Sequence, residues 1–79
     1  MKISEAMSKK LLKICEERGI SVNKLASTCC LTQSTVQNII EGNSTNPKLL
    51  TVVRICEGLG ISLSEFFDDE LFSNIDRED

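Results

Sequence analysis

The sequence predicts an all-α fold, a compact arrangement of five short helices in one small domain. Apolar residues recur at helical offsets of three, four and seven in successive stretches of the chain. Residues that favour helix starts, such as Ser21 and Thr32, precede these stretches, and glycines that favour helix ends, such as Gly19 and Gly42, follow them. A chain of 79 residues buries only roughly 60 to 65% of its unfolded surface, which is consistent with pairing to a second copy.

The first helix is expected from about Ser4 to Arg18, with Gly19 at its end. One of its faces is apolar and should pack on the core, while most of its charged residues should face solvent. The inner face consists of Ile3, Met7, Leu11, Ile14 and Cys15, and the outer residues are Lys9, Lys10, Lys13 and Glu17.

Two short apolar runs stand close together within Val22–Ile40. Ser21 and Thr32 are placed to cap the helices that these runs predict, because each hydroxyl can accept a hydrogen bond from a free amide of the first turn. So few residues separate the runs that the helices must cross at a large angle, and the small Ala26 lets them approach closely. This is the layout of a helix-turn-helix. The apolar faces consist of Val22, Leu25, Ala26 and Cys29 in the first run and of Val36, Ile39 and Ile40 in the second.

The outer face of the third helix, from about Gln33 to Glu41, carries neutral amides and hydroxyls where a solvent face more often carries Lys and Glu. Amide side chains donate and accept together, as the N6 and N7 edge of adenine requires, and hydroxyls can serve several base edges. An ordinary polar surface is the competing interpretation, and the helix-turn-helix context favours the reading of bases. The residues concerned are Gln33, Ser34, Thr35, Gln37 and Asn38.

The fourth helix is expected from Pro47 to Leu59 with Asn46 as its cap, because the missing amide of proline costs nothing at the first helical position. Ser62 and Glu65 match a capping box, which predicts a short fifth helix through Phe66 and Phe67. The fourth helix is expected to bury Leu49, Leu50, Val53, Cys56 and Leu59, with Val52 and Ile55 at its margins.

The chain is expected to divide into a helical domain over residues 1–68 and an acidic tail over residues 69–79, which should fray from Asn74 onward. Leu63 and Phe66 are expected to pack within the chain. The tail also carries an apolar stripe, which the first helix, a second copy or another protein must cover. The candidate dimer contacts are Phe67, Leu71, Phe72 and Ile75.

The net charge of −3 is distributed unevenly along the chain. Up to Ser64 there are eight basic and five acidic side chains, a net charge of +3, whereas the residues from Glu65 onward have one basic and seven acidic side chains. A mildly basic body can neutralise phosphates. Its low charge predicts weaker nucleic-acid affinity and a shallower salt dependence than a strongly basic domain would have.

Several kinds of site and location are not expected. The cysteines Cys15, Cys29, Cys30 and Cys56 form no paired Cys-x-x-Cys clusters, and the chain has no histidine, so we expect no metal site. All but Cys30 lie on apolar faces, where cysteine acts as a small hydrophobe. Without a nucleophile and base pair or a Gly-rich phosphate loop, neither catalysis nor a cofactor is expected. The chain lacks a membrane-spanning run and the apolar core of a signal peptide, so we expect a cytoplasmic protein without membrane contact.

Taken together, the segments ERGISVNKLA, LTQSTVQNIIEG, NPKLLTVVRICEGLGIS and LSEFF resemble the Xre family, the Cro and phage-repressor type of helix-turn-helix protein. The similarity covers roughly Met7 to Phe67. It implies a compact five-helix, phage-repressor-like domain that binds double-stranded DNA. It also implies a small transcriptional regulator, expected to be a repressor, that acts as a dimer on a palindromic operator.

The resemblance also implies roles for individual side chains. Main-chain amides at helix starts can hold phosphate oxygens and so offset the low count of basic residues. Gln33, Ser34 and Asn38 match base-reading positions, with Gln37 beside them, and Ser21, Thr32, Asn43, Thr45, Asn46 and Lys48 match phosphate-facing positions.

The chain departs from the family pattern at three places. Val22 stands where the family often has a phosphate-binding Gln, so one anchor is missing. Cys30 stands where the turn usually carries Gly, so either the turn is reshaped or the backbone carries a strain of roughly 1 to 2 kcal/mol. Cys15 and Ile40 replace an Arg and a Glu that many members pair, and packing is expected in place of that ion pair.

A second functional hypothesis is a protein-interaction module, similar to an antitoxin or to a partner of a regulator. In this hypothesis the apolar stripe of the tail binds a protein and the helix-turn-helix serves mainly as a scaffold. The low positive charge and Val22 support it.

Overall fold

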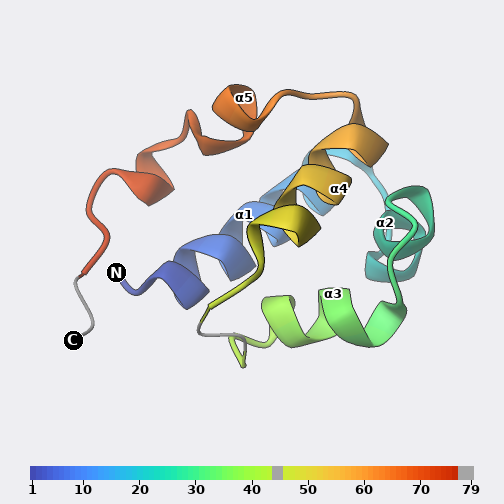
Figure 1. Ribbon diagram of the computed structural model, residues 1–79, viewed down its shortest axis with the longest axis horizontal. Helices are drawn as coiled ribbons and strands as arrows, with labels where there is room; N and C mark the ends of the chain where they lie inside the picture. The colour runs from blue at the N-terminus through green and yellow to red at the C-terminus, as the bar shows by residue number, and fades with distance from the viewer. Residues whose placement is uncertain (44–45, 77–79) are drawn as a thin grey trace.

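The structure, a computed structural model, describes residues 1–43 and 46–76, and it confirms the all-α fold (Figure 1). No strand occurs in these two ranges. The helices are α1 (Ile3–Arg18), α2 (Val22–Thr28), α3 (Gln33–Ile40), α4 (Leu49–Leu59) and α5 (Leu63–Phe67), followed by a 3-10 turn, η1 (Glu70–Phe72).

Every α-helix contributes to one apolar core. In Figure 1, α2 and α3 lie at one end of the molecule, and the chain through α5 and η1 runs across the other side. Helix α3 packs against both α1 and α2, α5 packs against α4, and η1 returns to α1. The largest fully buried side chains are Met7, Leu11, Leu25, Val36, Ile55 and Phe66.

The expected helix ends are largely confirmed. The hydroxyl of Ser21 accepts a hydrogen bond from the amide of Lys24, and the hydroxyl of Thr32 accepts one from the amide of Thr35. Ser62 and Glu65 form the complete capping box of α5. Gly19 adopts a left-handed φ of 63° after α1, a conformation that glycine reaches without steric cost.

Side chains of α1 also close the ends of two other helices. The Ser8 hydroxyl donates to the carbonyl oxygen of Ile40 at the end of α3. The Arg18 guanidinium donates to the carbonyl oxygen of Leu59 at the end of α4, at 2.9 Å. These carbonyls have no partner within their own helices, and a cation is favourable at the negative end of a helix dipole. Helix α1 therefore fixes where α3 and α4 end.

The predicted start of α4 is wrong by two residues. Helix α4 begins at Leu49, and its N-cap is Lys48, whose backbone is extended with φ −66° and ψ 136°. Asn46 is therefore not the cap, and Pro47 is not the first helical residue. Both belong to the connection from α3, where the missing amide of Pro47 is also tolerated.

The predicted inner face of α4 is also wrong in part. Leu49 and Leu50 are 63% and 60% exposed, whereas Val52 and Ile55 are buried in the core with Cys56 and Leu59. Apolar residues cover so much of this helix that its sequence allows more than one inner face. Packing into the shared core selects one of them. Gly58 lies so close to Cys29 that a Cβ atom at Gly58 would be 2.7 Å from the Cys29 Cα.

On α1, Lys10 was expected to face solvent and is instead buried. Its Nζ donates to the Asp69 carboxylate at 3.1 Å and lies 5.8 Å from the centre of the Phe66 ring. A buried ammonium needs such a partner. Among the apolar residues expected on the inner face, Ile3 is half-buried and Met7, Leu11, Ile14 and Cys15 are buried, as predicted.

The segment after α5 packs back onto α1. Phe66 is fully buried, as expected, and its ring lies 5.0 Å from the ring of Phe67 and 6.0 Å from that of Phe72. Leu63, also expected to pack within the chain, is 36% exposed. Of the proposed dimer contacts, Leu71 and Phe72 are half-buried within the chain, and Phe67 and Ile75 are each 37% exposed.

The two ends of the described chain meet. The amino group of Met1 donates to the Asn74 carbonyl oxygen at 3.2 Å and to the Asp76 carboxylate at 3.0 Å. The rest of the segment expected to fray, residues 77–79, lies outside the described residues. Within the described ranges, no helix has the length and apolar character needed to cross a membrane.

Candidate nucleic-acid interface

Helix α3 presents a polar face outward because its apolar residues are held in the core. Val36 and Ile39 are buried and Ile40 is half-buried, which fixes the rotation of the helix about its axis. Three of the four residues predicted to contact bases, Gln33, Ser34 and Asn38, are exposed, and the fourth, Gln37, is half-buried.

Of the two alternatives for the turn before α3, a reshaped turn or a strained backbone, the structure shows the strained backbone. Cys30 has a φ of 56°, and it is the one non-glycine residue with a positive φ in the described chain. Its amide bonds to the Ser27 carbonyl oxygen at 3.3 Å, and the Leu31 amide bonds to the Ala26 carbonyl oxygen at 2.9 Å. The turn thus keeps the left-handed conformation with a side chain present. Val22, at the start of α2, is half-buried against the core, so it does not replace the missing polar anchor.

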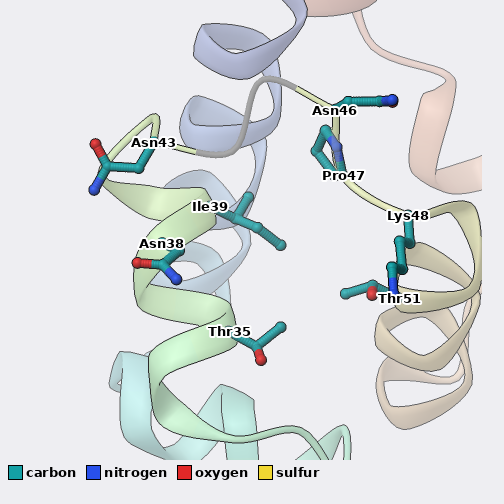
Figure 2. Close-up of a pocket in the computed structure, with 8 residues that line it drawn as sticks. All are labelled: Thr35, Asn38, Ile39, Asn43, Asn46, Pro47, Lys48 and Thr51. Atoms are coloured by element: carbon teal, nitrogen blue, oxygen red, sulfur yellow. The ribbon is translucent and has the colours of Figure 1, made fainter.

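A polar groove of about 500 Å³ lies between α3 and the start of α4 (Figure 2). Thr35, Asn38 and Ile39 line it on the α3 side, and Lys48 and Thr51 line it on the α4 side, with Asn43, Asn46 and Pro47 between them (Figure 2). The groove brings together four residues predicted from the sequence, namely Asn38, Asn43, Asn46 and Lys48.

The other described residues that were predicted to contact DNA do not line this groove. Gln33, Ser34 and Gln37 are on α3 but do not line the groove. Ser21 and Thr32 serve as helix caps. Thr45 lies outside the described residues.

Thr35 was expected on the outer polar face of α3 but not among the contact residues, and Thr51 was not expected at the site at all. Thr35 precedes Asn38 by three positions, which places the two on neighbouring parts of one helix face and could have indicated its position. Thr51 lies in the first turn of α4, and its place depended on the start of that helix.

Sequence reasoning also missed Glu41, which holds two of the predicted contact residues. The Gln37 Nε2 donates to the Glu41 Oε1 at 3.0 Å, and the Asn43 Nδ2 donates to the Glu41 Oε2 at 3.1 Å. A glutamate four positions after a glutamine on a helix could have indicated the first of these bonds. The second depends on how the chain turns after α3.

The start of α4 differs from the starts of α2, α3 and α5. Those three helices have side-chain caps, whereas Lys48 provides no side-chain hydrogen bond to the first turn of α4. The positive end of the α4 dipole therefore lies beside the Lys48 ammonium at the edge of the groove. Both features are favourable for an anion.

Three of the cysteines behave as core residues. Cys15, Cys29 and Cys56 are buried, and burial raises the pKa of each thiol because the thiolate would lose its hydration. The Cys29 thiol also donates to the Ile55 carbonyl oxygen at 3.5 Å. Cys30 is the exposed cysteine. In the part of the chain that the structure covers, no three His, Cys, Asp or Glu side chains are grouped as metal ligands would be.

Comparisons with known proteins agree with this arrangement. A helix-turn-helix family model matches residues 3–66. The crystal structure of the prophage Lp1 protein 11 superposes with a TM-score of 0.79 at 33% sequence identity, covering 95% of this chain and 100% of that chain. A comparison with curated proteins found no match. The family match and this structural relative together show that the chain belongs to the Xre family of DNA-binding helix-turn-helix regulators, the Cro and phage-repressor type.

Proposed function

We propose that this protein binds a specific double-stranded DNA sequence and represses transcription as a dimer on a palindromic operator. The observation that carries the proposal is the outward polar face of α3 beside a groove that ends at the uncapped start of α4. A face of neutral amides and hydroxyls can read base edges, and a helix start beside a lysine can hold a phosphate. The relative of prophage origin supports a phage-type regulator.

We assign the two kinds of contact to different parts of this surface. Gln33, Ser34, Gln37 and Asn38 read bases in the major groove of the duplex. Ser21, Thr32, Asn43, Thr45, Asn46 and Lys48 hold the phosphates on either side. Phosphate contacts fix the position of the protein on the duplex, and base contacts carry sequence information.

The proposed dimer uses the apolar residues of the tail, Phe67, Leu71, Phe72 and Ile75. Phe67 and Ile75 retain exposed surface, whereas Leu71 and Phe72 are half-covered by their own chain. The same partial cover leaves less apolar surface for a different protein partner. We therefore place the protein-interaction module second.

The proposal is tested by selecting an operator from random duplexes and measuring affinity by fluorescence anisotropy. Asn38→Ala should relax the base preference at one step of the operator, at a cost of about 1 to 3 kcal/mol for the preferred base. Lys48→Ala should weaken binding to all sequences alike and reduce the salt slope by about 1. Absence of binding to any duplex at low salt would refute the proposal.

The dimer is tested in the same experiment by stoichiometry. Sedimentation of the protein with a labelled palindrome and with a single half-site should give two chains and one chain, respectively. Phe67→Ser with Ile75→Ser should lower the cooperativity of binding to the palindrome. The matched control is Leu12→Ser, which changes an apolar residue on α1 that is 46% exposed. It should leave the cooperativity unchanged.

A further inference from the structure

We propose that Glu41 is a positioning residue that orients Gln37 for a two-point contact with adenine, and that it thereby sets the base preference at one step of the operator. The inference rests on the proposed function, because it assigns a role within the same DNA-reading surface. Its geometric basis is the pair of hydrogen bonds from Gln37 and Asn43 to the Glu41 carboxylate.

The carboxylate determines which atoms of its partners face it. An ionised carboxylate only accepts hydrogen bonds, so the amide nitrogens of Gln37 and Asn43, and not their oxygens, must point at Glu41. The distances of 3.0 and 3.1 Å are those of well-formed hydrogen bonds. The direction of the Gln37 amide is therefore set by chemistry.

The orientation leaves Gln37 with the groups that adenine needs. One N–H of its amide is used by Glu41, and the second N–H and the carbonyl oxygen remain. An amide reads adenine by donating to N7 and accepting from N6. Guanine presents acceptors at both N7 and O6, so an amide held in this orientation should favour adenine.

The Glu41 carboxylate is itself held in place by the residues that follow α3. Gly42 has a φ of 75°, and the Asn43 amide nitrogen bonds to the Asn38 carbonyl oxygen at 3.0 Å. This path brings the Asn43 side chain back to the second oxygen of Glu41. With both oxygens held, Glu41 loses much of its freedom to rotate. A preformed side chain binds more tightly, because the entropic cost of ordering it on binding is avoided.

The carboxylate also has an opposing effect on affinity. Its negative charge beside a DNA-binding face repels phosphates of any sequence. Glu41 therefore lowers the affinity for all duplexes and raises the preference for one base. These two effects can be separated by experiment. Removal of the charge should act on all duplexes equally, whereas loss of positioning should act at a single base step.

The test compares Glu41→Ala, Gln37→Ala and the double variant on the selected operator and on duplexes changed at each step. Glu41→Ala should raise the affinity for non-operator duplexes and lower the preference for adenine about 2- to 10-fold at the step that Gln37→Ala also affects. In the Gln37→Ala background it should cause no further loss of preference. Glu16→Ala, which removes an exposed acid on α1, is the control and should leave the preference unchanged.

Three outcomes would overturn the inference. One is a uniform gain of affinity in Glu41→Ala with unchanged base preference, since Glu41 would then act through charge alone. Another is a loss of preference at a step that Gln37 does not affect. The third is an equal loss in the Gln37→Ala background.

A measurement without DNA separates this inference from the proposed function. In NMR spectra of the free protein, the side-chain amide protons of Gln37 and Asn43 should exchange more slowly with water than those of Gln33. Glu41→Ala should abolish the difference while the backbone spectrum stays that of the folded protein. Unprotected amides would overturn the positioning role, whereas failure to bind any duplex would refute the proposed function.

Discussion

At the scale of single residues, the backbone at Cys30 carries strain in the middle of the helix-turn-helix. Its φ of 56° lies in the left-handed region, where a Cβ atom crowds the following carbonyl oxygen. Within the described residues, the exposed thiol makes no hydrogen bond that would offset this cost. The conformation persists because α2 and α3 are both anchored in the core.

Cys30→Gly should therefore stabilise the protein. The relief of roughly 1 to 2 kcal/mol in the folded state exceeds the extra chain entropy of glycine in the unfolded state, roughly 0.5 to 1 kcal/mol. The free energy of unfolding, measured by urea denaturation, should rise by about 0.5 to 1 kcal/mol. Cys30→Ala keeps the Cβ atom and should give no gain. Equal gains from both variants would show that the thiol, and not the backbone, is responsible.

At the scale of helices, the packing of α2 against α4 depends on Gly58. A Cβ atom there would lie 2.7 Å from the Cys29 Cα, 2.8 Å from the Cys29 Sγ and 2.8 Å from the Thr28 carbonyl oxygen. Two of these three atoms belong to the backbone, so no rotation of a side chain can make room. The contact holds the end of α2 close to α4 and so helps to set the position of the helix-turn-helix on the core.

Gly58→Ala should destabilise the protein by about 1 to 3 kcal/mol, the usual cost of overpacking a core. In a helix without this contact, alanine would stabilise the protein relative to glycine by roughly 0.5 to 1 kcal/mol. The sign of the change in the free energy of unfolding therefore shows whether the close contact exists. Thermal and urea denaturation measure it. Glu57→Ala, at the exposed neighbouring position, should change stability by less than about 0.5 kcal/mol. A more stable Gly58→Ala protein would show that the two helices are not packed this closely.

At the scale of the whole molecule, the acidic end of the chain is tied to the basic face of α1. Lys10 and Lys13 both donate to the Asp69 Oδ2, at 3.1 and 2.9 Å, and the Leu71 amide donates to the Asp69 Oδ1 at 3.0 Å. The Leu71 amide, followed by the two lysines, lowers the pKa of Asp69 well below its ordinary value. Asp69 also neutralises two of the lysines that give the body its positive charge.

The stability of the protein should therefore decrease in acid. Because the pKa of Asp69 is lower in the folded chain, the unfolded chain binds more protons there as the pH falls. The stabilisation is complete above the ordinary pKa and is lost progressively as the pH falls from about 5 toward the lower pKa of the folded chain. Asp69→Asn should lower the stability at pH 7, and the difference between the two proteins should shrink steadily as the pH falls from about 5 to about 2.

Urea denaturation across this pH range measures the effect. Asp68→Asn, at an exposed neighbouring position, is the control and should follow the wild-type curve. A constant difference between wild type and Asp69→Asn at all pH values would show that Asp69 does not stabilise the fold through its charge.

The fold was predictable because local signals agree along most of the chain. The hydroxyl caps at Ser21 and Thr32 and the capping box at Ser62 act within one helical turn, so their partners follow from spacing alone. The outward face of α3 followed in the same way, because its three apolar residues leave one direction for the polar ones.

The candidate site was predictable only in part. Asn38, Asn43, Asn46 and Lys48 were named from the sequence and lie together around one groove, although their contacts with DNA remain predictions. Thr51 and the bond between Asn43 and Glu41 were missed, because both depend on the path of the chain between α3 and α4. Glu41 and Asn43 follow the end of α3, so the periodicity of that helix does not place them.

The sequence by itself determined the five helices, the hydroxyl caps of α2, α3 and α5 and the polar surface of α3, since these depend on interactions between residues a few positions apart. Only the tertiary structure decided which side of α4 is buried, where Lys10 finds its partner and how the tail is covered. Leu50 and Val52 are both apolar, but Leu50 is 60% exposed and Val52 is buried in the core. Such choices depend on contacts between distant parts of the chain, which no local pattern records.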